Sequence, residues 1–221
     1  MKKLYGVGTG PGDAEHLTLK AVRVINQADV IFAPNNKGRN MALDTVKPFI
    51  QDKKVVLIDF PMGQVEKEYY NSAAKTIEEE ISEAGSGVFL TIGDPMVYST
   101  FIYIVEEIEK MGVEAEVVPG ITSFTAGAAV CKTPLTEKGD RFLLCDEMVD
   151  EEVLKHCDSI CILKTSKGKE DILNILEKNN FSYSYIKRCT LPEELVLTDR
   201  EEILEDRDYI SFIIGRRKRD D

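Results

Sequence analysis

Length, composition and charge exclude several classes of protein. The chain has 221 residues, 43% hydrophobic and 30% charged, which is typical of a globular protein with one large or two small domains. Its net charge of −11 argues against nucleic acid as a partner, and no apolar run is long enough to span a membrane. Five scattered cysteines predict reduced thiols in a cytoplasmic protein, and with only two histidines we expect no metal site.

The first half of the chain alternates strand and helix patterns. The expected strands are residues 4–7, 30–33, 55–58, 88–92 and 115–118. The expected helices are residues 17–28, 44–50, 68–84 and 101–111, and the apolar face of the last one suits either the core or an interface. This alternation predicts a mostly parallel sheet with helices on both faces. Since open α/β sheets bind ligands at the carboxyl ends of their strands, the segments that follow each strand are the candidate ligand-binding loops.

A glycine-rich loop follows the first predicted strand. It contains Gly8, Gly10, Pro11 and Gly12 and ends in Asp13. It departs from the dinucleotide-binding pattern, because Pro11 interrupts the run where a helix should begin. We interpret it as a loop of close-approach glycines that frames a cleft, the alternative being a structural loop whose glycines only supply positive φ angles. Asp13 is either a base or, as aspartates more often are, the N-cap of the segment that follows.

The most informative motif follows the strand at residues 88–92. A Gly93-Asp94-Pro95 turn leads there into the helix expected at residues 101–111. A glycine at the end of a strand lets a ligand approach the backbone, and Pro95 suits the first turn of a helix. The alternative interpretation is an ordinary strand-to-helix turn with a good N-cap.

A third turn follows the strand at residues 115–118 and leads into a helix expected at residues 124–131. Thr122 and Ser123 stand near the start of that helix, where their hydroxyls can cap it or border a ligand. The second half begins near Pro119, so we expect domains at residues 1–118 and 119–221, with an active-site cleft at their junction.

The second half is predicted to be a smaller α/β unit. Its expected strands are residues 141–145, 159–163, 184–189 and 209–214. Its further helices are expected at residues 151–156 and 169–178, and residues 190–199 are expected to form a hairpin leg or a loop.

Together these motifs resemble the tetrapyrrole (corrin/porphyrin) methylase family. The matching pieces are, in order, GVGTGPGDAEHLTLKA, ADVIFAP, GDPMVYST, VPGITSF, PLTEKGDRF, ILKTSKGKEDI and TLPEELV. They cover nearly the whole chain. The resemblance implies two α/β domains of the tetrapyrrole methylase type, distinct from Rossmann-fold methyltransferases. The Tyr98-Ser99-Thr100 continuation is similar to that of enzymes that methylate carbon 20 of precorrin-2 or of its cobalt complex, cobalt-factor II.

The resemblance also implies a methyl donor and a set of site residues. The donor is S-adenosylmethionine, no metal is bound by the protein, and any cobalt arrives within the substrate ring. The residues implied at the donor are Gly93, Asp94, Pro95, Val97, Tyr98, Thr122, Ser123, Lys164, Cys189 and Gly215. Those implied at the substrate are Gly8, Gly10, Pro11, Gly12, Ser99, Thr100 and Arg141, with Asp13 as candidate base. Because precorrin-2 carries many carboxylates, we expect basic side chains nearby, from among Lys20, Arg23, Lys37, Arg39 and Arg141.

Other functions stay open at this point. The chain is similar in fold family to enzymes that methylate other ring carbons, ribosomal RNA or diphthamide precursors, and a tetrapyrrole carrier without enzymatic activity is the non-catalytic alternative. The acidic charge disfavours the RNA substrate. The resemblance further implies a homodimer. The motifs do not distinguish a metal-free ring from one that already contains cobalt.

Overall fold

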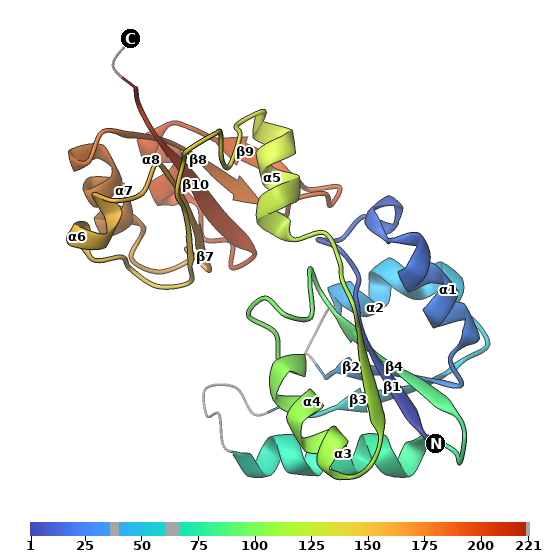
Figure 1. The fold of residues 1–221 in the computed structure, drawn as a ribbon. Helices are drawn as coiled ribbons and strands as arrows, with labels where there is room; N and C mark the ends of the chain where they lie inside the picture. The colour runs from blue at the N-terminus through green and yellow to red at the C-terminus, as the bar shows by residue number, and fades with distance from the viewer. Residues whose placement is uncertain (36–39, 61–66, 220–221) are drawn as a thin grey trace. The chain divides into compact units, whose positions relative to one another are not determined.

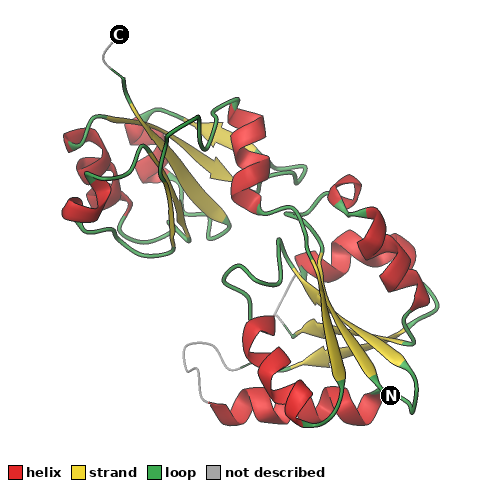
Figure 2. Ribbon diagram, viewed as in Figure 1, coloured by secondary structure: helices red, strands yellow, loops and turns green. Residues whose placement is uncertain are grey.

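The computed structural model describes residues 1–35, 40–60 and 67–219 and divides the chain into two compact units. Unit 1 is Met1–Thr122 and unit 2 is Ser123–Asp221, whereas the sequence placed the boundary after residue 118. Figures 1 and 2 show the helices and strands of each unit.

Unit 1 contains a five-stranded sheet in the order β3-β2-β4-β1-β5. The strands are β1 (Lys3–Gly8), β2 (Val30–Pro34), β3 (Lys54–Ile58), β4 (Ser86–Thr91) and β5 (Glu114–Val118). Every pairing is parallel, as the alternation of strands and helices predicted. Strands β2 and β4 are almost wholly buried, which explains why they are continuous apolar runs and not alternating patterns.

Helices cover both faces of this sheet (Figure 2). Helices α1 (Leu19–Gln27) and α2 (Met41–Val46) pack on one face, and α3 (Lys67–Glu80) and α4 (Phe101–Lys110) pack on the other. Two short 3-10 helices, η1 (Ala14–His16) and η2 (Lys47–Phe49), complete the unit.

Two of these helices begin at other residues than predicted, because capping side chains set where they start. Thr18 accepts a hydrogen bond from the Ala21 amide and makes α1 begin at Leu19. Asn40 caps α2 through the Leu43 amide, so this helix begins before the predicted residue 44.

Unit 2 contains a mixed sheet in the order β6-β7-β10-β8-β9. The strands are β6 (Phe142–Cys145), β7 (Ser159–Leu163), β8 (Phe181–Lys187), β9 (Leu195–Leu197) and β10 (Ser211–Arg217). Only β6 and β7 pair in parallel among these neighbours. Strand β9 confirms the hairpin leg expected within residues 190–199.

The helices of unit 2 also lie on both sides of the sheet. They are α5 (Ser123–Cys131), α6 (Glu151–Leu154), α7 (Lys169–Lys178) and α8 (Arg200–Glu205). Ile213 of β10 packs with α7 and α8, whereas its neighbour Phe212 lies against Gly127 of α5. Helix α8 was missed from the sequence, although Asp199 caps it through the amides of Glu201 and Glu202.

Candidate functional site

The three motif-bearing loops of unit 1 leave the sheet at one edge. Strand β1 lies between β4 and β5, and all three run in the same direction. In the strand register, Gly8 pairs with Thr91 and Val7 pairs with Val118. The glycine-rich loop, the Gly-Asp-Pro turn and the Pro-Gly turn therefore emerge side by side, where an open α/β sheet binds its ligands.

Gly8, Gly93 and Gly120 bring the backbones of these three loops into direct contact. A Cβ atom on Gly8 would lie 2.5 Å from the Gly93 oxygen and 2.6 Å from the Gly120 nitrogen, and a Cβ on Gly120 would collide with the same oxygen. No L side chain fits at either position without moving the backbone. Sequence reasoning placed Gly8 against the substrate and left Gly120 out. The Pro-Gly pair was the signal for Gly120.

Gly93 differs from the other two because the space beside it is open. Its amide donates to the Gly10 oxygen at 2.8 Å, and the Gly10 amide donates back at 3.3 Å. Gly93 has φ +71°, yet a Cβ there would meet no atom of the described residues within 4 Å. The glycine is needed for its backbone angle, and the space next to its Cα is open.

Asp94 links the loop after β4 to the loop after β5 by hydrogen bonds. One carboxylate oxygen accepts the Met96 amide at 2.8 Å, within the loop between β4 and α4. The other accepts the Gly120 amide at 3.0 Å, from the loop after β5. A residue expected to bind the donor therefore holds the Gly-Asp-Pro turn and the Pro-Gly turn together.

The rest of the Gly-Asp-Pro loop departs from expectation in two respects. Helix α4 begins only at Phe101, so Pro95 lies in a turn and not in the first helical turn. Ser99, predicted to contact the substrate, is 7% exposed, and its hydroxyl accepts the Phe101 amide at 3.1 Å, so its side chain points into unit 1. Tyr98 is 48% exposed at φ +46°. Val97 is half-buried, as is Thr100 at the start of α4.

The glycine-rich loop is held by its own polar contacts. The Asp13 carboxylate accepts the Glu15 amide at 2.8 Å and caps η1, which is the structural role that the sequence favoured. Pro11 is buried, and the Gly12 oxygen accepts the hydroxyl of Thr45 at 3.0 Å.

In unit 2 the structure brings Lys164 and Cys189 to one end of the sheet and places Gly215 and Arg141 away from it. Lys164 follows β7 and forms an ion pair of 2.8 Å with Asp146. Cys189 follows β8, which leaves the sheet at the same edge, because Leu163 and Ile186 both pair with Phe212. Burial raises the pKa of the Cys189 thiol to about 12, which makes it unreactive.

Gly215 and Arg141 are placed elsewhere. Gly215 lies within β10, where a Cβ would be 3.0 Å from the Ile160 side chain, so it allows close packing in the core. Arg141 precedes β6, at the opposite end of that strand from Asp146, and its amide donates to Asp158 at 2.8 Å.

The basic side chains expected near the substrate are only partly available. Lys20 forms an ion pair of 2.6 Å with Glu116, and Lys20 together with Lys3 lowers the pKa of Glu116 to about 2. Arg23 is exposed, whereas Lys37 and Arg39 lie outside the described residues. Within the described ranges, no group of three or more His, Cys, Asp or Glu side chains is arranged to hold a metal ion, and no helix is long and apolar enough to cross a membrane.

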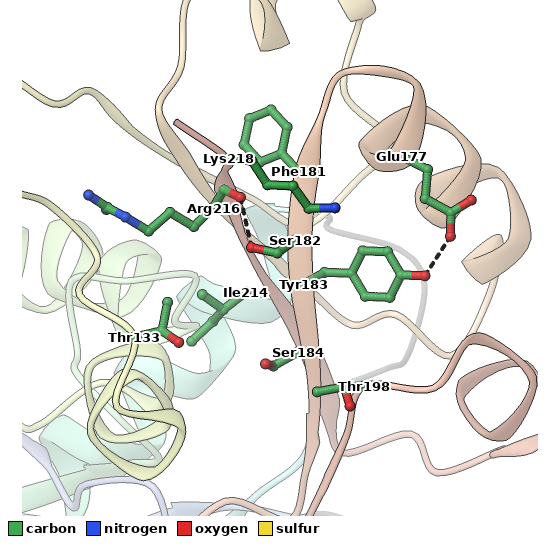
Figure 3. Close-up of a pocket in the computed structure, with 10 residues that line it drawn as sticks. All are labelled: Thr133, Glu177, Phe181, Ser182, Tyr183, Ser184, Thr198, Ile214, Arg216 and Lys218. Atoms are coloured by element: carbon green, nitrogen blue, oxygen red, sulfur yellow. Dashed lines mark hydrogen bonds between the residues drawn. The ribbon is translucent and has the colours of Figure 1, made fainter. Parts of the chain in front are cut away.

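A separate hollow of about 480 Å³ lies over β8 and β10 in unit 2 (Figure 3). Two of its polar groups are engaged within the unit: the Tyr183 hydroxyl donates to Glu177 at 2.6 Å, and the Ser182 hydroxyl donates to the Arg216 backbone oxygen at 3.1 Å. None of the predicted site residues lines it.

Comparison with known proteins agrees with this architecture. The family model "Tetrapyrrole (Corrin/Porphyrin) Methylases" matches residues 3–204. The chain is 35% identical to a probable cobalt-precorrin-2 C(20)-methyltransferase of Methanocaldococcus jannaschii, over 98% of this chain and 97% of the relative. It is 30% identical to the cobalt-precorrin-2 C(20)-methyltransferase of Salmonella typhimurium, over 96% and 95%.

Solved structures share the fold. A uroporphyrin-III C-methyl transferase from Thermus thermophilus, complexed with S-adenosyl homocysteine, matches with a TM-score of 0.74 at 22% identity, over 97% of both chains. A cobalt precorrin-4 methyltransferase matches with a TM-score of 0.76 at 21% identity, over 97% of this chain and 94% of that one. The family model and the full-length relatives confirm that this chain belongs to the tetrapyrrole (corrin/porphyrin) methylase family.

Proposed function

We propose that this protein transfers a methyl group from S-adenosylmethionine to carbon 20 of precorrin-2 in cobalamin biosynthesis. The observation that carries the proposal is similarity along the whole chain to two relatives named for that reaction, at 35% and 30% identity. Both names specify the cobalt form, whereas a Sinorhizobium relative named for precorrin-2 itself is 26% identical. The cobalt complex is therefore the proposed physiological substrate.

The glycine crossing of unit 1 suits a methyl donor bound against main chain. Gly93 has open space beside it, Gly10 hydrogen-bonds to its backbone, and the neighbouring Asp94 carboxylate accepts the Gly120 amide. We assign the donor contacts in this unit to the loop from Gly93 to Tyr98 and to Thr122. In unit 2 we assign them to Ser123 and to the segments that carry Lys164 and Cys189. Gly215 has a packing role, which makes it the weakest member of the set.

The reaction needs little covalent chemistry from the protein. The donor supplies a sulfonium methyl, a carbon–carbon bond forms as the carbon–sulfur bond breaks, and S-adenosylhomocysteine leaves. An in-line displacement depends mainly on positioning, so rigid loops around the donor favour it. The positive charge of the sulfonium is lost, and a water-poor site therefore accelerates the transfer. Asp13 is the candidate acceptor for the proton that leaves the ring, although its carboxylate already caps η1.

A homodimer is proposed on family resemblance alone. The apolar face of α4 is not available for it, because Phe101, Ile104 and Ile108 are fully buried in the core of unit 1. Light scattering at micromolar concentration should give twice the chain mass, and a monomer mass would contradict the proposal. A cytoplasmic location is proposed on the five cysteines, which are all free.

Donor binding and methyl count test the proposal. Calorimetry with S-adenosylhomocysteine should give a dissociation constant in the micromolar range, which corresponds to a binding free energy on the order of −8 kcal/mol. Mass spectrometry after incubation of the cobalt complex of precorrin-2 with S-adenosylmethionine should show one added methyl. Donor binding without methylation of this substrate would favour another acceptor, and no donor binding would favour a tetrapyrrole carrier.

A further inference from the structure

Two buried hydroxyls face each other at the base of the loop between β4 and α4. Thr91 is the last residue of β4 and Ser99 stands just before α4. Their side-chain oxygens are 3.3 Å apart, and the residues are 8% and 7% exposed. Buried hydroxyls in hydrogen-bonding distance replace contacts that water would otherwise supply, so this pair ties the two ends of the loop together inside the unit.

The pair belongs to a longer set of hydrogen bonds. The Phe101 amide donates to the Ser99 hydroxyl, which leaves the proton of that hydroxyl free to reach Thr91. Thr9 of the adjoining loop donates both its amide and its hydroxyl to the backbone carbonyl oxygen of Thr91, at 2.8 Å and 3.2 Å. The chain of contacts thus runs from the end of β1, through the end of β4, to the first turn of α4.

The helix that Ser99 anchors is itself fixed on the sheet. Phe101 is fully buried, and its ring lies so close to Gly6 of β1 that a Cβ there would be 2.6 Å from its Cδ1 atom. Further along the loop, Gly93 pairs with the glycine-rich loop and Asp94 with Gly120. The hydroxyl pair therefore joins the two ends of the loop at its base.

We propose that Thr91 and Ser99 form a hydroxyl latch and that both act as positioning residues for the methyl donor. The latch does not touch the ligand. It holds the loop from Gly93 to Tyr98 in the conformation whose backbone meets the donor, and the positive φ of Tyr98 shows that this conformation needs support. The positioning role rests on the donor site proposed above, whereas the latch itself can be tested without any ligand.

The first test is hydrogen exchange in the ligand-free protein. Thr91→Val keeps the shape of the side chain and removes only its hydroxyl, so the exchange rate of the Phe101 amide and of its neighbours should rise by about tenfold. Thr91→Ser retains the hydroxyl and should exchange like the wild type. Ser72→Ala, at an exposed site on α3, is the matched control for Ser99→Ala and should change nothing in this loop.

The second test is a double-mutant cycle on donor affinity. Thr91→Val and Ser99→Ala should each weaken S-adenosylhomocysteine binding about fivefold or more, and the double variant should be little worse than Ser99→Ala, because both remove one interaction. The latch would be overturned if the two losses of affinity multiplied in the double variant, or if the Phe101 amide of Thr91→Val exchanged at the wild-type rate. If the wild type bound no S-adenosylhomocysteine, the positioning role would fail with the proposed function, while the exchange rates would still decide the latch.

Discussion

Single glycines in this site serve two different physical purposes. Gly120 has no room for a side chain, because the Gly93 oxygen occupies the position of its Cβ. Gly93 has room beside it but adopts a positive φ that L residues avoid. A motif shows only that glycine is present, so the structure is needed to distinguish a steric requirement from a conformational one.

The two requirements predict different stabilities. Gly93→Ala adds only backbone strain and should lower the free energy of unfolding by about 1–2 kcal/mol. Gly120→Ala adds a backbone collision that must displace the neighbouring loop, so it should cost about 3 kcal/mol, the upper end for overpacking, and weaken donor binding as well. Urea denaturation of both variants provides the comparison. Equal losses of unfolding free energy in the two variants would show that the loops around Gly8, Gly93 and Gly120 shift easily to make room for a side chain.

Asp13 can be assigned by one conservative substitution. Asn keeps an oxygen for the Glu15 amide, so Asp13→Asn should stay within about 1 kcal/mol of the wild type in stability. The Asp13 carboxylate is already engaged in capping η1, and we therefore expect turnover close to that of the wild type, with water or the substrate taking the proton. A fall in single-turnover rate of about 100-fold, with donor affinity unchanged, would make Asp13 the base instead.

At the scale of elements, a buried polar cluster joins α7, β8 and the end of α8. Lys169 is buried and donates to the oxygens of Ile203 and Asp206, which caps the carboxyl end of α8. Tyr185 donates to the Asp206 carboxylate at 2.7 Å, and Lys187 pairs with the same group. A cluster in which each group has a partner stabilises the arrangement of these elements, but it is costly to break.

The cluster predicts an acid-sensitive contribution to stability. Burial opposes ionisation of Asp206, but its bonds with Lys187, the Asp208 amide and Tyr185 outweigh burial and lower its pKa to about 2. The depressed value means that the stabilisation is complete above the unfolded pKa, near 4, and is lost as the pH falls toward about 2.

Asp206→Asn should therefore remove about 2 kcal/mol of unfolding free energy at pH 7 and flatten its dependence on pH between about 4 and 2. Denaturant titrations across this range measure it. Asp171→Asn, at an exposed position on α7, is the control and should keep the slope. A slope unchanged in Asp206→Asn would show that other carboxylates govern acid unfolding.

The elements also show what the sequence could predict. The parallel sheet of unit 1 was predictable, since its strands are apolar runs separated by helical patterns. The helix starts were displaced by Thr18 and Asn40, because a single capping side chain decides where a helix begins. The motif loops were found, but the contact between Asp94 and Gly120 depends on how strands far apart in sequence align. The burial of Ser99 was missed for the same reason, since a hydroxyl near a helix start can point either way.

At the scale of the whole molecule, the net charge of −11 poses a question of recognition. The proposed substrate carries carboxylates, yet many lysines of the described chain are occupied by acidic partners, as Lys20 is by Glu116 and Lys54 by Glu80. We therefore expect any positive charge at the substrate to be confined to a local patch, while the overall negative charge favours solubility.

The central claim is that this member of the family methylates carbon 20 of a precorrin-2 ring. The most direct measurement uses S-adenosylmethionine labelled with ¹³C in the methyl group and precorrin-2 with and without cobalt, followed by nuclear magnetic resonance assignment of the labelled carbon. We predict one labelled methyl, bonded to carbon 20, with faster turnover of the cobalt complex. A label on any other ring carbon, or no label on either ring while the protein binds the donor, would contradict the claim.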